Sequence, residues 1–345
     1  MVILCSLTLA GYLKDGAFDF LAASRQTRQE IVEIEIPEQI SISNLAKILK
    51  ENKIIDKEEF FKLYFNLTAK DDLEYVKAGK HAIAANMDYQ EIIDNLLSGD
   101  AAEVVKITVV EGDNVLDIAN LLEENEVCSA EDFLKEVNLS TYQNNSYPQI
   151  KELTNTTERY YLLEGYLYPD THFFYKDSKP STVVETLLGN FEIKTKFLDD
   201  LFAESEYTKD EIMTLASIIQ KEAANVTDMY NISAILHNRL KNGAANDVPM
   251  LQCDSTIYYP YHTKKDLPEH LAKQKYESKY STYSIEGLPA GAICNPGIDA
   301  IKAALMPSEE YSDYLYFCHS KDGTAYYART ADEHIENERL AGLRE

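Results

Sequence analysis

The 345-residue sequence lacks the cysteine patterns that mark metal sites and disulfide frameworks. Its five cysteines include no C-x-x-C pair, and no histidine stands at metal-ligand spacing from them. We therefore expect no metal ion and no cofactor. The odd number of cysteines argues against a full disulfide framework and leaves a single bridge between Cys253 and Cys294 open.

Long apolar runs are also lacking. The first segment, Met1 to Leu13, is apolar but shorter than the roughly 20 residues of a membrane-spanning helix. It has no basic flank of the kind that begins a signal peptide. Three interpretations stay open: a buried first helix, a signal-peptide core, or the end of a transmembrane anchor that begins before this chain.

Basic residues are few. The chain has 33 of them against 58 acidic residues, which gives a formal net charge of −25. Such a surface repels phosphate backbones, so nucleic acid is not an expected partner, and solubility is the simplest reason for the charge. With 45% apolar residues, the composition is that of a globular protein, and the length predicts two or three compact units.

The part of the chain before Ser140 contains an internal repeat. A constant shift along the chain aligns Glu35–Lys62 with Thr108–Lys135 without a gap, and the identical pairs include Leu49 with Leu122 and Phe60 with Phe133. Each copy reads as a strand and an amphipathic helix, followed by a second helix that opens at Asp56 or Ser129. Between them, Tyr75–Gly99 reads as strand, turn and helix. The sequence therefore predicts an α+β module built by duplication over positions 31–140.

A polar stretch, Ser140–Thr157, follows this module and predicts a linker at residues 141–158. Beyond it, residues 159–345 are dense in tyrosine, although the chain has no tryptophan. The segment LLEGYLYPDTHFF suits either a wall on which sugar rings stack or a part of the core. Gly287–Gly297 reads as a long irregular loop, a type of segment that often carries function.

The strongest local signal is a predicted helix over Asp210–Ala224. Thr208 and Glu211 form a capping box that fixes its start. A buried stripe at helical spacing consists of Ile212, Leu215, Ala216 and Ile219. Glu222 falls on this stripe, where burial should raise the pKa of its carboxyl and make it a general acid at neutral pH. The alternative is a solvated helix end, or an ion pair with Arg239.

Polar residues follow in the next two segments. A helix predicted over Thr227–Asn242 carries Asn238, and Gly243 is its expected end. Gln252, Asp254 and Thr256 would share one face of an extended cleft wall, or else they form a turn that caps a following helix. The histidines have no serine or cysteine partner at motif spacing, which argues against a nucleophilic triad.

Five motifs in order resemble the YceG-like endolytic murein transglycosylase family over about Leu162 to Asn337. They read LEGYLYPDTHFF, LASIIQKEAANVTDMYNISAILHNRL, MLQCDSTIYY, YSTYSIEGLPAGAICNPGIDAIKAAL and YLYFCHSKDGTAYYARTADEHIEN. The N-terminal repeat resembles the LysM-like region of the same family. The resemblance implies an α+β fold, with a duplicated LysM-like module followed by a mixed α+β catalytic domain at 159–345 that carries its acid on a helix.

The resemblance also implies the chemistry. The family cleaves the β-1,4 bond between N-acetylmuramic acid and N-acetylglucosamine, and Glu222 occupies its catalytic glutamate in A-S-I-I-x-K-E. Glycosidases that use water need two carboxyl groups. A lytic transglycosylase needs one, because the C6 hydroxyl of the sugar closes a 1,6-anhydro ring. Asp254 keeps a muramidase-type hydrolase open as an alternative, and a non-catalytic peptidoglycan-binding scaffold is another.

Further residues match the family's motifs. Asn238, Gln252, Asp254, Thr256 and Tyr283 are expected to contact substrate in the cleft. Glu164 is a further expected substrate contact, and Gly287, Pro289 and Gly291 match the later loop. Tyr166 stands where a larger aromatic residue is common and Ser255 where many members have proline. We expect both departures to affect saccharide contacts or loop stiffness more than the acid.

The resemblance finally implies a setting. Residues 1–13 would be the remnant of a single-pass membrane anchor and 14–30 a juxtamembrane linker, with the catalytic domain outside the cytoplasmic membrane. The expected partners are peptidoglycan strands, penicillin-binding proteins and other wall-synthesis proteins, and the expected role is to end the growth of nascent glycan strands.

Overall fold

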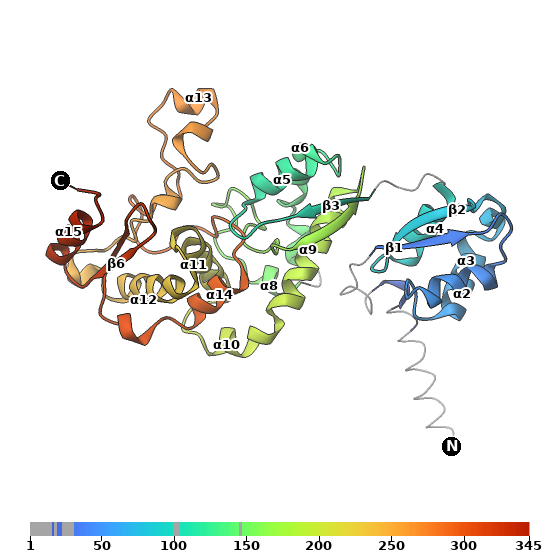
Figure 1. Cartoon of the computed structure of the whole chain (residues 1–345), viewed down its shortest axis with the longest axis horizontal. Helices are drawn as coiled ribbons and strands as arrows, with labels where there is room; N and C mark the ends of the chain where they lie inside the picture. Colours follow the sequence, from blue (N-terminus) through green and yellow to red (C-terminus); the bar gives the residue numbers. More distant parts are fainter. Residues whose placement is uncertain (1–15, 17–18, 23–30, 99–103, 145–146, 345) are drawn as a thin grey trace, which may run out of the picture. The chain divides into compact units, whose positions relative to one another are not determined.

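The computed structural model describes residues 16, 19–22, 31–98, 104–144 and 147–344 (Figure 1). They divide into two compact units. The first takes in the described part of Met1–Thr108 with Glu124–Cys128 and Thr171–Asn190, and the second takes in Val109–Glu123, Ser129–Asp170 and Phe191–Glu345. Within the described ranges, no helix is both long enough and apolar enough to cross a membrane. The apolar segment at 1–13 lies outside them.

The first unit contains an antiparallel pair, β1 (Ile31–Ile36) and β2 (Gly79–Ala84), with Ile31 opposite Ala84. Side chains of β1 alternate between solvent and core, as the twofold period of a strand requires. Three helices accompany the pair: α2 (Ile42–Glu51), α3 (Glu58–Thr68) and α4 (Tyr89–Ser98). A short 3-10 helix, η1 (Lys70–Tyr75), follows α3. Strand and helices bury one core, which includes Ile36, Leu49, Phe61, Ile83 and Tyr89.

The predicted repeat appears in the order of the elements. The shift that aligns the two copies also carries the start of β1 onto the start of β3 (Val104–Thr108), and the start of α2 onto the start of α5 (Val115–Glu124). A second helix, α6 (Ala130–Glu136), follows α5 as α3 follows α2. However, β3 pairs with β4 (Thr171–Tyr175) and not with the β1–β2 sheet. The strand–helix–helix reading of each copy is confirmed, whereas the LysM-like nature of the module stays a prediction.

The second unit is mainly helical. Its longest helices are α11 (Lys209–Glu222) and α12 (Val226–Asn242), and α14 (Ile298–Leu305) packs against both. A hairpin of β5 (Tyr316–His319) and β6 (Ala325–Ala328) contacts α15 (Ala331–Leu340). The remaining helices are α7 (Thr141–Asn144), α8 (Pro148–Lys151), α10 (Asp199–Glu204) and α13 (Glu269–Ala272), with α9 (Pro180–Thr195) crossing the boundary between the units. The mixed α+β class is confirmed.

The helix α11 forms as its sequence predicts. Thr208 accepts the backbone N–H of Glu211, and Glu211 caps Thr208 in return, so the capping box is present. The predicted stripe is buried at all four positions. The helix α12 ends at Gly243, also as expected, and Asn225 caps its start by accepting the N–H of Asp228.

Three other expectations are decided by the structure. The tyrosine-rich segment is core, because Leu163, Tyr166 and Leu167 are fully buried, so the sugar-stacking interpretation is wrong for them. Cys253 and Cys294 are free thiols and form no bridge. The extended wall at 252–256 is also wrong. Gln252 has a left-handed φ of 51°, and residues Asp254–Thr256 form a 3-10 turn.

Candidate active site

Glu222 is the last residue of α11. The helix ends there because Ala223 turns to an extended conformation, with ψ of 141°, while its N–H still bonds the carbonyl of Ile219. The Glu222 side chain is partly buried, on the same face as the fully buried Ile219. The carbonyl dipoles at the end of a helix disfavour a negative charge. Position and burial therefore both favour the protonated carboxyl.

Ser255 is the hydrogen-bond partner of this carboxyl. Its hydroxyl donates to Oε1 of Glu222 at 2.7 Å, and its backbone N–H donates to the same oxygen at 3.2 Å. Burial raises the pKa of Glu222 above its ordinary value. The two Ser255 donors oppose that rise, and the charge of Asp254 adds to it. Ser255 therefore acts on the acid directly, so our expectation for this departure from the family pattern is wrong.

Asp254 and Tyr283 lie next to this pair. The Tyr283 hydroxyl donates to Oδ1 of Asp254 at 2.7 Å, and both side chains are exposed. Burial and the neighbouring Asp254 carboxylate together raise the pKa of the Tyr283 phenol. The structure thus brings Glu222, Asp254 and Tyr283 together, from three segments of the chain.

Gln252 and Thr256 lie on the same segment as Asp254 but differ in exposure. The Gln252 side chain is exposed, and the backbone N–H of Gln252 donates to the carbonyl of Thr282 at 3.0 Å. Thr256 is fully buried, and its hydroxyl bonds the carbonyl of Cys253 and lies 3.0 Å from the Thr282 hydroxyl. Thr256 therefore holds the 252–256 turn against Thr282.

Asn238 and Glu164 do not join this group. The Asn238 amide donates to the carbonyls of Tyr311 and Tyr314, both at 2.9 Å. Glu164 is 1% exposed, so its carboxyl faces protein groups and not solvent. It accepts from Val115 N–H, the Tyr259 hydroxyl and the Asn295 amide at 2.9 to 3.2 Å.

Asp228 supports the site, although the sequence analysis did not single it out. It is buried and accepts the N–H of Ala224, just beyond Glu222 in the chain, at 2.8 Å. The same oxygen lies 2.7 Å from His319 Nε2, and the other accepts the Tyr327 hydroxyl at 2.6 Å. Asn225 and Asp228 have the spacing of a helix cap, and this signal in the sequence could have shown that Asp228 lies in the first turn of α12. Its partners 91 and 99 residues away carry no such signal.

Arg239 was the alternative partner for Glu222. Its guanidinium instead donates to the carbonyls of Leu315 and Leu251 and is buried. Burial lowers the pKa of this guanidinium from its ordinary value. The interpretation of an ion pair between Glu222 and Arg239 is therefore wrong, and Arg239 joins the loop before the 252–256 turn to the segment that leads into β5.

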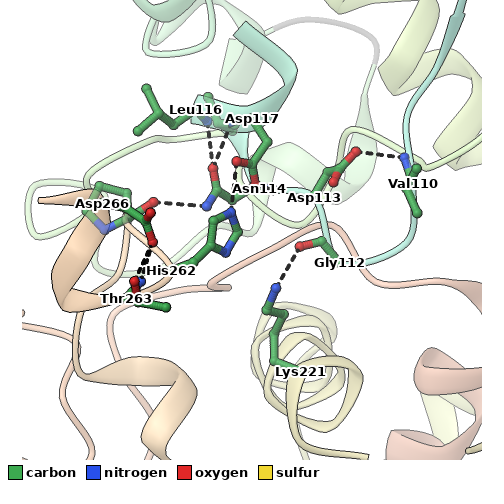
Figure 2. A network of polar contacts seen from close by, with 12 residues as sticks. Val110, Gly112, Asp113, Asn114, Leu116, Asp117, Lys221, His262, Thr263 and Asp266 are labelled. Carbon is green, nitrogen blue, oxygen red and sulfur yellow. Dashed lines mark hydrogen bonds and ion pairs between the residues drawn. The ribbon is translucent and has the colours of Figure 1, made fainter. Parts of the chain in front are cut away.

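The residue before the acid also has a defined contact. Lys221 donates to the carbonyl of Gly112 at 3.3 Å, in the turn that precedes α5 (Figure 2). Nearby, the Asn114 amide donates to the carbonyl of Pro260, and His262 lies 2.9 Å from Asp117. This network fixes the start of α5 on α11 and on the 260–263 segment.

The arrangement offers one carboxyl that can act as a general acid. Its Oε1 is held by Ser255, no hydrogen bond to Oε2 is present among the described residues, and the side chain is partly exposed. Asp254 is the neighbouring second carboxylate, but it does not bond Glu222. Across the described ranges, no group of three or more His, Cys, Asp or Glu side chains could hold a metal ion.

The chain is similar to a protein family, to proteins of known name and to a solved structure. A model described as the YceG-like family matches residues 34–340. An endolytic murein transglycosylase of Bacillus subtilis is 31% identical over 313 positions, 88% of this chain and 82% of that protein. One of Streptococcus pneumoniae is 25% identical and covers 98% of this chain, which spans 63% of that protein. The crystal structure of a YceG-like protein from Listeria monocytogenes matches with a TM-score of 0.57 at 28% identity, covering 89% of this chain and 99% of that one.

These similarities and the single acid at the end of α11 define the class. The chain is an enzyme, a lytic transglycosylase, and therefore a lyase. It belongs to the YceG-like family, whose model covers most of its length. The resemblance drawn from the sequence motifs is confirmed.

Proposed function

We propose that this enzyme cleaves peptidoglycan strands internally at the β-1,4 bond between N-acetylmuramic acid and N-acetylglucosamine, leaving 1,6-anhydro ends. The observation that carries the proposal is the state of Glu222. It is a carboxyl with a raised pKa at a helix end, held on one oxygen and partly open to solvent. The names of the relatives, endolytic murein transglycosylase, supply the substrate class.

The proposed reaction uses Glu222 twice. The protonated carboxyl donates its proton to the glycosidic oxygen as the bond from that oxygen to C1 breaks. Ser255 then stabilises the carboxylate through its two hydrogen bonds to Oε1. The carboxylate takes the proton of the C6 hydroxyl, whose oxygen bonds C1 and closes the anhydro ring. One proton is thus returned to Glu222, and no water is consumed.

The surrounding residues have two proposed roles. Gln252, Asp254 and Tyr283 are exposed beside the acid and would contact the saccharide. Asn238, Thr256 and Glu164 have their polar atoms bonded to protein groups, so they would instead position the loops that carry the contacts.

The setting is also proposed. Because peptidoglycan lies outside the cytoplasmic membrane, the catalytic domain would work there, held near the membrane by a segment that includes residues 1–13. Wall-synthesis proteins, including penicillin-binding proteins, would be its partners, and cleavage would end the growth of nascent strands.

The test is the mass of the products. Wild-type protein digesting purified peptidoglycan should release muropeptides that end in 1,6-anhydro-muramic acid, and Glu222→Gln should release them at least about 10²-fold more slowly. Products that carry an added water would instead establish a hydrolase, the alternative that the proximity of Asp254 to the acid favours. Retained binding to peptidoglycan without any product would establish a scaffold. Either result would overturn the proposal.

A further inference from the structure

Residues 258–277, which we call the α13 arm, begin against the start of α5 and lead to α13, which stands clear of the helices α11 and α12 (Figure 1). The arm is closed at its base, where the N–H of Ser278 donates to the carbonyl of Ile257 at 2.8 Å. Within it, the Tyr276 hydroxyl donates to the carbonyl of Tyr259, and the 3-10 helix η5 (Lys264–Asp266) is capped by Thr263. Hydrogen bonds thus hold the arm in a defined conformation.

A hollow of about 310 Å³ lies between this arm and Tyr283. Its walls combine aromatic and basic side chains, among them Tyr258, Tyr276, Tyr283, Lys264 and Lys275. Its volume lies at the lower end of the range of ligand pockets, so it would take a short peptide branch and not a second glycan strand.

The hollow carries local positive charge on a strongly acidic protein. Lys264 and Lys275 form no ion pair with a carboxylate of the described residues. Glu277 is the acidic residue of the lining. Its Oε1 accepts the hydroxyls of Ser284 and Ser281, and these hydrogen bonds and the charge of Lys275 lower the pKa of its carboxyl. The lining thus has two ammonium groups against one carboxylate, and this local excess of positive charge on a chain of net charge −25 suits an anion.

The hollow shares Tyr283 with the surroundings of the acid. Tyr283 lines the hollow and donates its hydroxyl to Asp254, and the next residue, Ser255, holds Glu222. Tyr283 therefore links the hollow to the residues beside the acid, on the side where a group attached to the bound sugar could extend. The muramyl sugar of the proposed substrate carries such a group, a peptide joined through its lactyl ether and bearing free carboxylates.

We infer that the hollow of the α13 arm binds the anionic peptide branch of the muramyl sugar, with its carboxylates at Lys264 and Lys275 and its chain against the tyrosines. The inference rests on the proposed function, because it takes the substrate of that site as given. It makes the enzyme selective for glycan that still carries its peptides.

The experiment compares soluble glycan strands that carry their peptides with the same strands after an amidase has removed them. Wild-type protein should cleave the peptide-bearing strands with a kcat/KM about three- to tenfold higher, the gain expected of two partly exposed charge pairs. The double variant Lys264→Ala/Lys275→Ala should lose this preference and cleave the bare strands at the wild-type rate. Lys265→Ala/Lys273→Ala is the matched control, since it removes the same charge from lysines of the arm that do not line the hollow.

Three results would overturn the inference: no preference in the wild type, an equal loss on both substrates in the double variant, or an equal loss of preference in the control. A binding measurement separates it from the proposed function. Glu222→Gln protein should bind the peptide-bearing strands more tightly than the bare ones, and the two lysine substitutions should abolish the difference. This binding measurement decides the inference even where no strand is cleaved.

Discussion

Glu164 and Glu222 lie in two regions of the second unit, and burial raises the pKa of both carboxyls, but they differ in how many partners they have. Glu164 is enclosed, with donors from Val115, Tyr259 and Asn295 on its two oxygens. Burial raises the pKa of Glu164 to about 8. Glu222 has a single partner residue, Ser255, and is open to solvent on one side.

Solvent access, and not the raised pKa, distinguishes the carboxyl that can react. Burial raises the pKa of both carboxyls, so a raised pKa alone does not separate them. The Glu164 carboxyl faces protein groups, and its partners tie the start of α5 to the loop that contains Asn295. Glu222 combines a raised pKa with access. Variants of the two residues should therefore fail in different ways.

The largest expected effect is that of Glu222→Gln. The amide cannot donate an acidic proton or take one back, so kcat should fall about 10²- to 10⁴-fold. The Ser255 donors can still bond the amide oxygen, so the melting temperature should stay near that of the wild type. The rate of anhydro-product release, together with a thermal melt, checks both statements. A variant that keeps most of its activity would remove Glu222 from the mechanism.

Glu164→Gln should do the opposite. At pH 5 the protonated carboxyl carries one hydrogen, whereas the amide NH₂ carries two, so one of them would face a group that donates. Such a mismatched buried polar group costs about 1–3 kcal/mol of unfolding free energy. Activity per folded molecule should fall far less than in Glu222→Gln, because the buried side chain positions loops and does not face solvent. Denaturant unfolding at pH 5 beside a cleavage assay at low temperature makes the comparison.

The pH dependence sharpens this prediction. The pKa of Glu164 is about 8 in the folded protein, above its ordinary value of 4.5, so the folded state binds more protons than the unfolded state between these pH values. Its contribution to stability is complete below about pH 4.5 and is lost as the pH rises toward 8. The stability gap between wild type and Glu164→Gln should therefore shrink over this range. A gap that widens would show that Glu164 is ionised in the folded protein.

Much of α11, the helix that carries Glu222, could be predicted from sequence. The capping box, the buried stripe and the place of Glu222 on it follow from spacing along one helix, which local rules describe well. The repeat predicted the order of β3, α5 and α6 for the same reason.

The surroundings of the acid could not be predicted in this way. Ser255 reaches Glu222 from 33 residues away, because Gln252 takes a left-handed φ and turns the following residues into a 3-10 turn. A side-chain period states which face a residue occupies, but it does not state which loop lies against the end of a helix. Asp228 and His319 are a second instance, since β5 brings them together across 91 residues.

Ser255→Ala removes the hydroxyl that bonds Glu222. Its expected effect on activity is smaller than that of Glu222→Gln. A donor to a carboxylate favours the charged form, so removing the hydroxyl should raise the pKa of Glu222 further. The alkaline limb of the kcat/KM profile should move to higher pH, by up to about one unit, which corresponds to about 1.4 kcal/mol. Ser129→Ala, which removes a hydroxyl from Asp132, is the control and should leave the limb in place. A shift to lower pH would contradict the assigned direction.

The smallest effect is expected for a substitution at His262, which contacts the start of α5, as Glu164 does. His262 bonds Asp117, on the same turn of α5 as the Val115 N–H that Glu164 accepts, and this hydrogen bond raises the pKa of the imidazole (Figure 2). Because both side chains are partly exposed, the pair should contribute less than about 1 kcal/mol. A raised histidine pKa gives stability that is complete below the unfolded value, about 6.5, and is lost as the pH rises through the folded one. His262→Ala should therefore destabilise the protein slightly at pH 5.5 and less at pH 8.5 in matched unfolding curves. An effect that grows with pH would show that the imidazole bonds Asp117 in its neutral form.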